Sequence, residues 1–291
     1  MPYCTSCFML RDAQDGRYAV PAVNVENMEM ALAAMEAAEE RRSPIILQTT
    51  PTTVAYGGAQ VYAALVRRRA EASPVPVSLH LDHGNSLSLL RDAAAAGYSS
   101  LMIDGSKLPF EENTDLTRRA VSVARRWGLP LEAELGRLGG KEDAAVSAES
   151  SYTDPEMAAV FAERTGLSSL AVSIGTAHGI YKGVPRIDLE RLERIRSRTA
   201  VPLVLHGSSG LENQVVRDCI ARGICKVNFA TDLRLVYSAA VKRYLREQPD
   251  AFDPKSYSSE GWQAVRRRVA EIIDLCGSAG RAPSDPIAAQ P

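Results

Sequence analysis

Short apolar runs recur along the chain at roughly even spacing, and a helical pattern follows each of them. Within several runs, apolar residues alternate with polar ones, as in residues 76–84, which is typical of a strand. Turn residues bound the runs and helix-forming residues follow, so each run reads as a strand leading into a helix. The predicted strands lie at residues 18–25, 44–50, 76–84, 99–106, 129–136, 170–176, 201–207 and 225–230.

The helical stretches lie between these strands. They are expected at residues 27–42, 58–72, 85–97, 111–127, from 154 onward, 188–198, 212–222, 231–247 and, after the last strand unit, 260–275. Eight strand-and-helix units predict a closed α/β barrel, a (β/α)8 TIM barrel, more readily than an open sheet. We expect one domain over residues 1–277 with an additional C-terminal helix, and a disordered tail over residues 278–291.

Polar side chains gather at the carboxyl ends of the predicted strands. In this fold the loops at that end carry the active site, so acids and histidines there indicate an enzyme. These residues are Asn24, Gln48, Thr50, Asp82, His83, Asp104, Glu134, His178, His206 and Asn228.

Three of the four histidines follow separate strands, and a glycine comes directly after each. Three imidazoles that converge from different strands match a catalytic zinc site that keeps one position open for substrate. We therefore predict His83, His178 and His206 as zinc ligands. His80 lies inside its strand, where we expect it to form supporting hydrogen bonds.

Glycine-rich turns follow the sixth and seventh strands, at residues 175–179 and 206–210. The eighth strand ends in residues 228–232 at the start of a helix. Loops after strands seven and eight are the usual phosphate site of this barrel, where backbone amides and a helix N-terminus donate hydrogen bonds. The sequence thus predicts a phosphorylated substrate beside a metal.

Composition narrows the class of protein. The formal net charge is −1, so no basic face indicates a nucleic-acid partner. The five scattered cysteines favour reduced thiols over a disulfide framework. We find no secretory signal and no apolar run long enough for a membrane span, so we expect a cytoplasmic protein without a membrane partner.

Seven segments in order resemble a family of known enzymes, the class II, zinc-dependent ketose-bisphosphate aldolases, over essentially the whole length. They lie at residues 21–24, 81–84, 102–106, 134–136, 175–179, 205–207 and 226–228. Residues 134–143, 148–150, 153–155 and the ending 276–282 look most like the tagatose-bisphosphate branch.

The resemblance implies a role for most of these residues. His83, His178 and His206 would hold the zinc, and Asp82 would be the acid and base at the C4 hydroxyl. Glu142, on a lid after the fifth strand, would shuttle the proton on the enolate carbon. Asp104 and Glu134 would lie near an alternative metal position. Predicted substrate contacts are Asn24, Gln48, Thr50, Gly179, Gly207, Ser208, Ser209, Asn228, Phe229, Ala230 and Thr231.

The implied reaction is reversible cleavage of tagatose or fructose 1,6-bisphosphate to dihydroxyacetone phosphate and glyceraldehyde 3-phosphate, with one Zn²⁺ per subunit as Lewis acid. The resemblance also implies a homodimer or homotetramer, a monovalent cation and a separate accessory subunit. Residues 48–51 differ from the serine-bearing segment common in fructose-specific members, so the sugar stays open.

Three alternatives remain. Lys226 shares the strand parity of Asn228 and could face the barrel interior, where a buried amine could form a Schiff base. The three glycine-flanked histidines would then have no task. The chain could also be a non-catalytic assembly subunit of the same fold, or a class II aldolase that acts on a related phosphorylated sugar acid.

Overall fold

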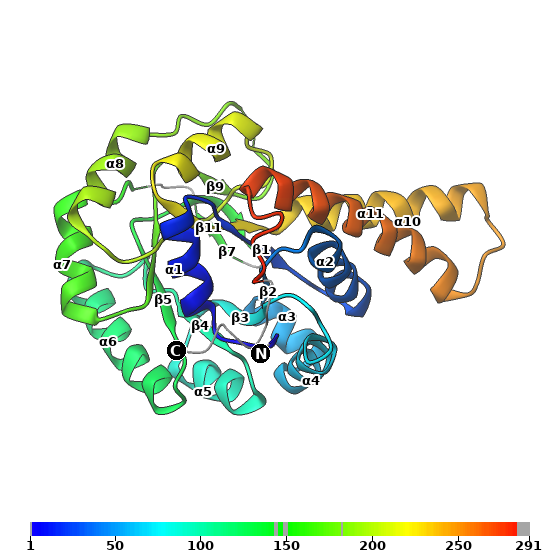
Figure 1. Ribbon diagram of the computed structural model, residues 1–291, viewed down its shortest axis with the longest axis horizontal. Helices are drawn as coiled ribbons and strands as arrows, with labels where there is room; N and C mark the ends of the chain where they lie inside the picture. Colours follow the sequence, from blue (N-terminus) through cyan, green and yellow to red (C-terminus); the bar gives the residue numbers. More distant parts are fainter. Residues whose placement is uncertain (1, 143–144, 148–150, 182, 284–291) are drawn as a thin grey trace.

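Eight parallel strands form a closed barrel in the computed structural model, which describes residues 2–142, 145–147, 151–181 and 183–283, with side chains described outside 141–147. The predicted single-domain (β/α)8 TIM barrel is confirmed (Figure 1). Around the barrel, the strands are β1 (Val20–Asn24), β2 (Ile45–Thr49), β3 (Val77–Gly84), β4 (Ser100–Ile103), β5 (Leu131–Leu135), β8 (Ser169–Val172), β10 (Leu203–Leu205) and β11 (Ile224–Phe229), which pairs with β1.

Helices surround the barrel on its outside (Figure 1). Several begin at side-chain caps: Asn27, Ser86, Asp154 and Asp188 each accept a hydrogen bond from a first-turn amide. The helices outside the barrel are α2 (Met28–Arg41), α4 (Ala59–Ala70), α5 (Leu87–Ala96), α6 (Phe110–Arg126), α7 (Pro155–Thr165), α8 (Leu189–Arg198), α9 (Asn213–Ala221) and α10 (Thr231–Glu247).

Two helices were not predicted. α1 (Ser6–Gly16) precedes the first strand, and α3 (Pro51–Gly57) follows β2. α1 places Met9 and Leu10 in a buried cluster with Val20, Ala22 and Ile46 of the barrel. The helix therefore packs against the amino-terminal end of the barrel interior and closes it with apolar side chains.

The last helix, α11 (Pro254–Cys276), begins earlier than the predicted residue 260, because Asp253 caps it and Pro254 occupies its first turn. α10 and α11 lie side by side and project from the barrel, and α11 returns to pack on α2 (Figure 1). Of the tail expected from residue 278, Ser278 and Gly280 hydrogen-bond to Ser43 and Arg41, and residues 284–291 lie outside the described part.

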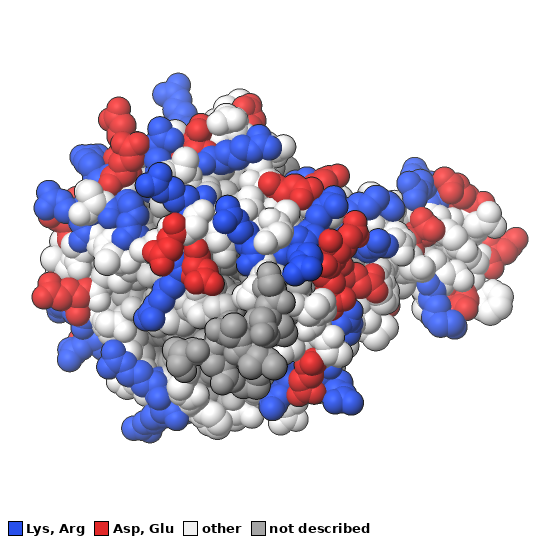
Figure 2. Space-filling model, viewed as in Figure 1, with Lys and Arg blue, Asp and Glu red and all other residues white. Residues whose placement is uncertain are grey.

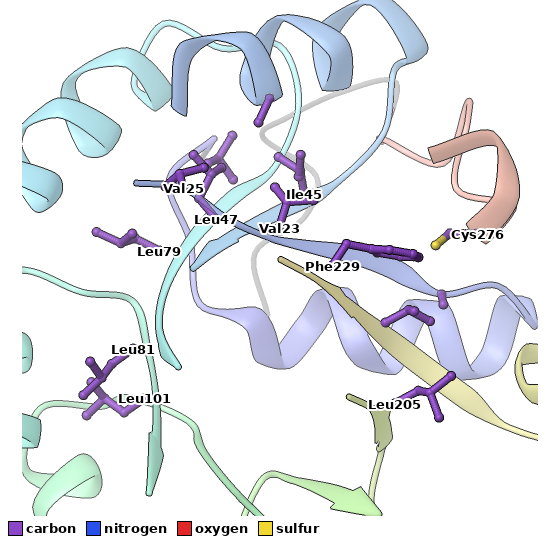
Figure 3. Close-up of a cluster of buried hydrophobic side chains, with 14 of the residues drawn as sticks. Val23, Val25, Ile45, Leu47, Leu79, Leu81, Leu101, Leu205, Phe229 and Cys276 are labelled. Atoms are coloured by element: carbon purple, nitrogen blue, oxygen red, sulfur yellow. The ribbon is translucent and has the colours of Figure 1, made fainter. Parts of the chain in front are cut away.

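The two faces of the barrel strands differ in chemistry, as period-two alternation requires. Outward-facing side chains such as Leu47, Leu79, Leu81 and Leu101 are fully buried in an apolar cluster beneath the helices (Figure 3). Inward-facing side chains are largely polar, among them Ser78, His80, Asp82, Ser100, Glu132, Glu134, Lys226 and Asn228, all buried. Apolar side chains fill the interior at its amino-terminal end, where Val20, Ala22 and Ile46 pack against α1.

The long polar segment after β5 contains strands that the sequence did not predict. β6 (Gly139–Glu142), β7 (Ala145–Ser147) and β9 (Ala177–His178) form a small three-stranded sheet at the barrel mouth. A side chain at Gly140 would meet the His178 carbonyl oxygen at 2.1 Å, so this glycine permits the close pairing of β6 and β9. The sheet links the segment that carries Glu142 to the segment that carries His178.

Charged side chains of both signs are interspersed on the face shown in Figure 2, in keeping with the net charge of −1. Among the described residues, no helix is sufficiently long and apolar to cross a membrane.

Candidate active site

Three histidine side chains meet at the carboxyl end of the barrel. His83 is the last but one residue of β3, His178 lies in β9 and His206 directly follows β10. The ring centroids of His83 lie 5.1 Å from His178 and 4.8 Å from His206, and those of His178 and His206 are 6.0 Å apart. The candidate ligand atoms of all three lie within 4.8 Å of one another. The structure thus brings together the three predicted zinc ligands.

The backbone around these histidines is tightly constrained. His83 has a φ of 48°, which is rare for a residue with a side chain and marks local strain. The β3–β4 register shifts between Leu81 and Gly84, so the chain bulges where His83 turns toward the mouth. A side chain at Gly84 would meet the Met102 carbonyl oxygen at 2.3 Å. This glycine is therefore required by the packing beside His83.

Two carboxylates orient two of the imidazoles. His83 Nδ1 lies 2.9 Å from Asp104 Oδ2, and His206 Nε2 lies 2.9 Å from Glu132 Oε1. Their other nitrogens, His83 Nε2 and His206 Nδ1, are 2.9 Å apart. Two nitrogens that bind one tetrahedral zinc at about 2.0 Å would lie about 3.3 Å apart. A nitrogen donor set with carboxylate partners behind the rings fits a catalytic zinc ion.

Burial and charge set the ionisation of these partners. Burial opposes ionisation of Asp104, but the hydrogen bond and charge of His83 hold the pKa of this carboxyl well below its usual range. Burial also opposes ionisation of Glu132, and the Lys226 ammonium and the His206 hydrogen bond hold its pKa well below the usual value. Both groups are therefore carboxylates that accept hydrogen bonds from the imidazoles.

A second set of possible metal ligands shares one histidine with the first. His83, Asp104 and Glu134 offer ligand atoms within 4.8 Å of one another. Glu134 Oε2 lies 4.0 Å from His83 Nδ1 and 3.8 Å from His206 Nδ1. Asp104 and Glu134, for which the resemblance implied an alternative metal position, are therefore adjacent to the histidine cluster.

Asp82 lies beside the histidine cluster and is 1% exposed. Its Oδ1 is 3.9 Å from His83 Nε2. Asn24 Nδ2 donates to its Oδ2 at 2.8 Å, and Asn228 Nδ2 donates to its Oδ1 at 3.4 Å. Gln48 Nε2 in turn donates to Asn24 Oδ1 at 3.0 Å. Amide side chains from three strands thus fix the plane of this carboxylate at the mouth.

A small cavity opens next to the histidines. It lies over the loops after β10 and β11 and the start of α10, where the phosphate site was predicted. Ser209 Oγ accepts from the amides of Ala230 and Asp232, which holds the loop after β10 against the start of α10. The residues that line the cavity are Asn24, His178, Gly179, His206, Gly207, Ser208, Ser209, Asn228, Ala230, Thr231 and Arg234.

Three of the predicted contacts do not reach this cavity. The Phe229 side chain is 1% exposed and lies in the apolar cluster outside the barrel (Figure 3). Thr50 caps α3 through the amide of Thr53 and is 1% exposed, and Gln48 contacts Asn24 behind Asp82. The side chain of Glu142 falls outside the described residues.

Sequence reasoning missed two charged residues at the site. Glu132 lies near the start of β5, away from the strand ends we searched, but it shares the inward parity of Glu134, which was the available signal. Arg234 lies in the first turns of α10 and lines the cavity. Its Nε donates to Glu26 Oε1 at 2.7 Å. A cation beside backbone amides suits an anionic ligand.

The comparisons with known proteins agree with this geometry. Residues 5–281 match the family model described as fructose-bisphosphate aldolase class-II. The YdjI aldolase from Escherichia coli K12 is 37% identical with a TM-score of 0.87, and the match covers 97% of this chain and 100% of that one.

Two further solved structures are similar. A putative fructose-1,6-biphosphate aldolase from Coccidioides immitis is 32% identical over 94% of this chain and 96% of that one, with a TM-score of 0.87. A fructose-bisphosphate aldolase from Campylobacter jejuni is 25% identical over 95% and 96%, with a TM-score of 0.81. Matching this family over nearly its whole length, the chain belongs to the class II fructose-bisphosphate aldolases, which are carbon–carbon lyases.

Proposed function

We propose that this protein is a zinc-dependent aldolase that reversibly cleaves a ketose 1,6-bisphosphate, tagatose or fructose, to dihydroxyacetone phosphate and glyceraldehyde 3-phosphate. The observation that carries the proposal is the cluster of His83, His178 and His206, whose ligand atoms lie within 4.8 Å of one another. Asp82 adjoins the cluster, 3.9 Å from His83. A phosphorylated sugar substrate and dihydroxyacetone phosphate as product agree with membership of the family.

The three histidines would hold one zinc ion, with Asp104 and Glu134 beside an alternative position. When bound, zinc supplies Lewis-acid polarisation of the substrate carbonyl, which makes the electron pair left on C3 less costly. The carboxylates behind His83 and His206 keep these rings oriented with one nitrogen directed into the cluster.

Asp82 would move the proton at the C4 hydroxyl. In cleavage, the carboxylate takes the hydroxyl proton while the C3–C4 bond breaks, and C4 leaves as the aldehyde carbon. In synthesis, the same carboxyl returns the proton to the new C4 oxygen. Asn24 and Asn228 hold the carboxylate for this task through the hydrogen bonds to its two oxygens. Glu142 would deliver the proton to C3, which completes dihydroxyacetone phosphate.

The cavity beside the histidines would bind the phosphate of the three-carbon product. Gly179, Gly207, Ser208 and Ser209 line it from two loops, and Asn228, Ala230 and Thr231 line it from the end of β11 and the start of α10. The amino-terminal end of a helix favours an anion, and Arg234 adds a positive charge at the rim. Further parts of the proposal are a homodimer or homotetramer, a monovalent cation, a separate accessory subunit and a cytoplasmic location.

The specific sugar is the finer part of the proposal. Similarity to the tagatose branch in residues 134–143 and 153–155 favours tagatose 1,6-bisphosphate. The matches to two proteins described as fructose-bisphosphate aldolases favour the other sugar. Both substrates carry the same phosphates and carbonyl and differ in configuration at C4, the carbon whose hydroxyl faces Asp82 in this proposal.

A coupled cleavage assay tests the proposal. The purified protein is given tagatose and fructose 1,6-bisphosphates side by side, before and after treatment with a chelator. We expect turnover that chelation abolishes and zinc restores, and the ratio of the two rates assigns the sugar. Cleavage that survives chelation but is lost with borohydride would instead assign the chemistry to Lys226. A zinc-loaded protein without turnover on either sugar would favour a phosphorylated sugar acid or an assembly role.

A further inference from the structure

A buried ion pair lies inside the barrel beneath the histidine cluster. Lys226 Nζ is 2.7 Å from Glu132 Oε2, and Glu132 Oε1 is 2.9 Å from His206 Nε2. The side chains of all three are at most 2% exposed. Lys226 does not line the cavity. Its ammonium donates to Glu132 in the barrel interior.

The position of Lys226 is fixed from more than one side. His80 Nε2 lies 3.3 Å from Lys226 Nζ, and His80 Nδ1 lies 2.7 Å from Ser100 Oγ. Ser100 Oγ in turn lies 2.8 Å from Ser6 Oγ of α1. Because an ammonium only donates, His80 Nε2 must accept and the proton of this ring resides on Nδ1. The chain of contacts runs from α1 through the barrel to His206.

The contacts of His206 determine which of its nitrogens carries the proton. Two groups lie near Nε2: the Glu132 carboxylate at 2.9 Å and the Asn228 amide nitrogen at 3.1 Å. The amide nitrogen can only donate, and it donates to Asp82 Oδ1. The carboxylate can only accept, and its shorter, charge-assisted contact decides that Nε2 carries the proton. The lone pair of Nδ1 is then directed toward His83 Nε2, 2.9 Å away. This is the tautomer that can give Nδ1 to a metal.

A buried salt bridge contributes little to stability relative to apolar residues of the same volume, because both ions lose their hydration. Stability alone therefore gives no reason for charges at residues 132 and 226. A metal-binding histidine, in contrast, gains from a carboxylate that fixes its ring and its tautomer. The carboxylate itself must be held in one place, and the short contact with Lys226 does this.

We propose that Lys226 and Glu132 are positioning residues that fix the ring and tautomer of His206, so that its Nδ1 faces the metal position. The inference rests on the proposed function in taking the histidine cluster as a zinc site. It gives Lys226 a task that does not involve a Schiff base, and it assigns Glu132, which lies outside the two clusters of possible ligands.

Zinc affinity, measured by competition with a chromophoric chelator, tests the proposal without reference to activity. We expect Glu132→Gln and Lys226→Met to bind zinc about 10–100-fold more weakly than the parent protein. We also expect the visible absorption spectrum of the Co²⁺-loaded variants to shift, because the His206 ring is no longer held. Glu39→Gln is the matched control, since it disrupts the Glu39–Arg69 ion pair at the surface and should leave both readouts unchanged.

A nitrogen NMR measurement on the unmodified, metal-free protein covers the case in which a core variant does not fold. The proposal requires the Nε2–H tautomer of His206. Observation of the Nδ1–H tautomer, or folded variants with parental zinc affinity and Co²⁺ spectrum, overturns the positioning role and leaves the aldolase proposal standing. A parent protein that binds no zinc overturns the aldolase proposal itself, while the tautomer still tests the contact with Glu132.

Discussion

The outer and inner faces of the barrel strands carry opposite chemistry, and β3 shows the contrast within four residues. Leu79 and Leu81 face outward into the apolar cluster under the helices (Figure 3). His80 and Asp82, between and after them, face inward to Lys226 and to Asn24. The outer face buries hydrocarbon and supplies the free energy of folding. The inner face is held by hydrogen bonds and directs polar groups to the mouth.

The inner face differs also along the barrel axis. At its amino-terminal end Val20, Ala22 and Ile46 pack against α1, as expected for a barrel interior. Above them lies the layer of Lys226 and Glu132, and the histidines stand at the mouth. The polar residues of the candidate site therefore lie on the inner face, from the middle of the barrel to its mouth. Substitutions on the two faces should therefore affect different measurements.

The largest expected effect concerns Asp82 on the inner face. Asp82→Ala should lower turnover by about 10²–10⁴, because the proton at the C4 hydroxyl loses its acceptor, while zinc content stays parental. Initial rates and bound metal per chain are the measurements. Asp115→Ala, which alters a carboxylate that is 70% exposed on α6, is the control. An Asp82→Ala protein that turns over near the parental rate would remove the assigned role.

On the outer face, Leu79→Ala should lower the free energy of unfolding by about 2–5 kcal/mol, since Leu79 is fully buried and the substitution leaves a cavity. Zinc affinity and the turnover number of the folded protein should stay parental. Urea unfolding and chelator competition measure the two quantities. Loss of zinc affinity in a folded Leu79→Ala protein would show that the two faces are not separate in effect.

A smaller effect is expected at the rim of the cavity. Arg234→Ala should raise the KM for the bisphosphate about tenfold, which corresponds to about 1.4 kcal/mol of lost binding, and should change kcat little. Steady-state kinetics measure both constants. Arg243→Ala is the control, because Arg243 lies on the same helix and pairs with Glu260 away from the cavity. An unchanged KM in Arg234→Ala would exclude Arg234 from phosphate binding.

An effect of similar size in free energy is expected in the pH dependence of stability. Burial and the Lys226 ammonium lower the pKa of His80 well below its usual value, so the folded protein keeps this ring neutral. The unfolded chain takes up a proton near pH 6.5, so the contribution of His80 to stability is lost as the pH falls through that value. The loss amounts to about 1.4 kcal/mol between pH 7.5 and 5.5.

Comparison of the metal-free parent with His80→Gln isolates this term. As the pH falls from 7.5 to 5.5, the unfolding free energy of the parent should fall by about 1.4 kcal/mol relative to that of the variant. The reason is that the variant has no imidazole to protonate at this position. Urea unfolding at several pH values measures both free energies. A difference that stays constant with pH would mean that the pKa of His80 is the same in the folded and the unfolded protein.

Much of the fold was predictable because each barrel strand is a short apolar run followed by a helical pattern, and several of these runs alternate apolar with polar residues. α1 was missed because its apolar face is short and Thr5 provides no side-chain cap. α3 and the start of α11 carried usable signals, Thr50–Pro51 and Asp253–Pro254, which we did not apply. The β6–β7 pair has no alternating apolar pattern, and pairing with β9 is a tertiary contact that local sequence does not contain.

The candidate site was predictable where residues stand at strand ends, as His83, Asp104, Glu134 and His206 do. Glu132 and the amide chain from Gln48 to Asn24 depend on which inward side chains meet across the barrel, and this follows from register and closure. Arg234 lies on a helix, outside the strand ends that the search used.

The central claim is that three histidines make this barrel a zinc-dependent aldolase, and zinc titration of the metal-free protein tests it most directly. Zinc is added to chelator-treated protein while cleavage of the preferred bisphosphate is followed. The account predicts no turnover at the start, a rise in proportion to added zinc, and a plateau at one ion per chain. Full turnover before any zinc is added would contradict it.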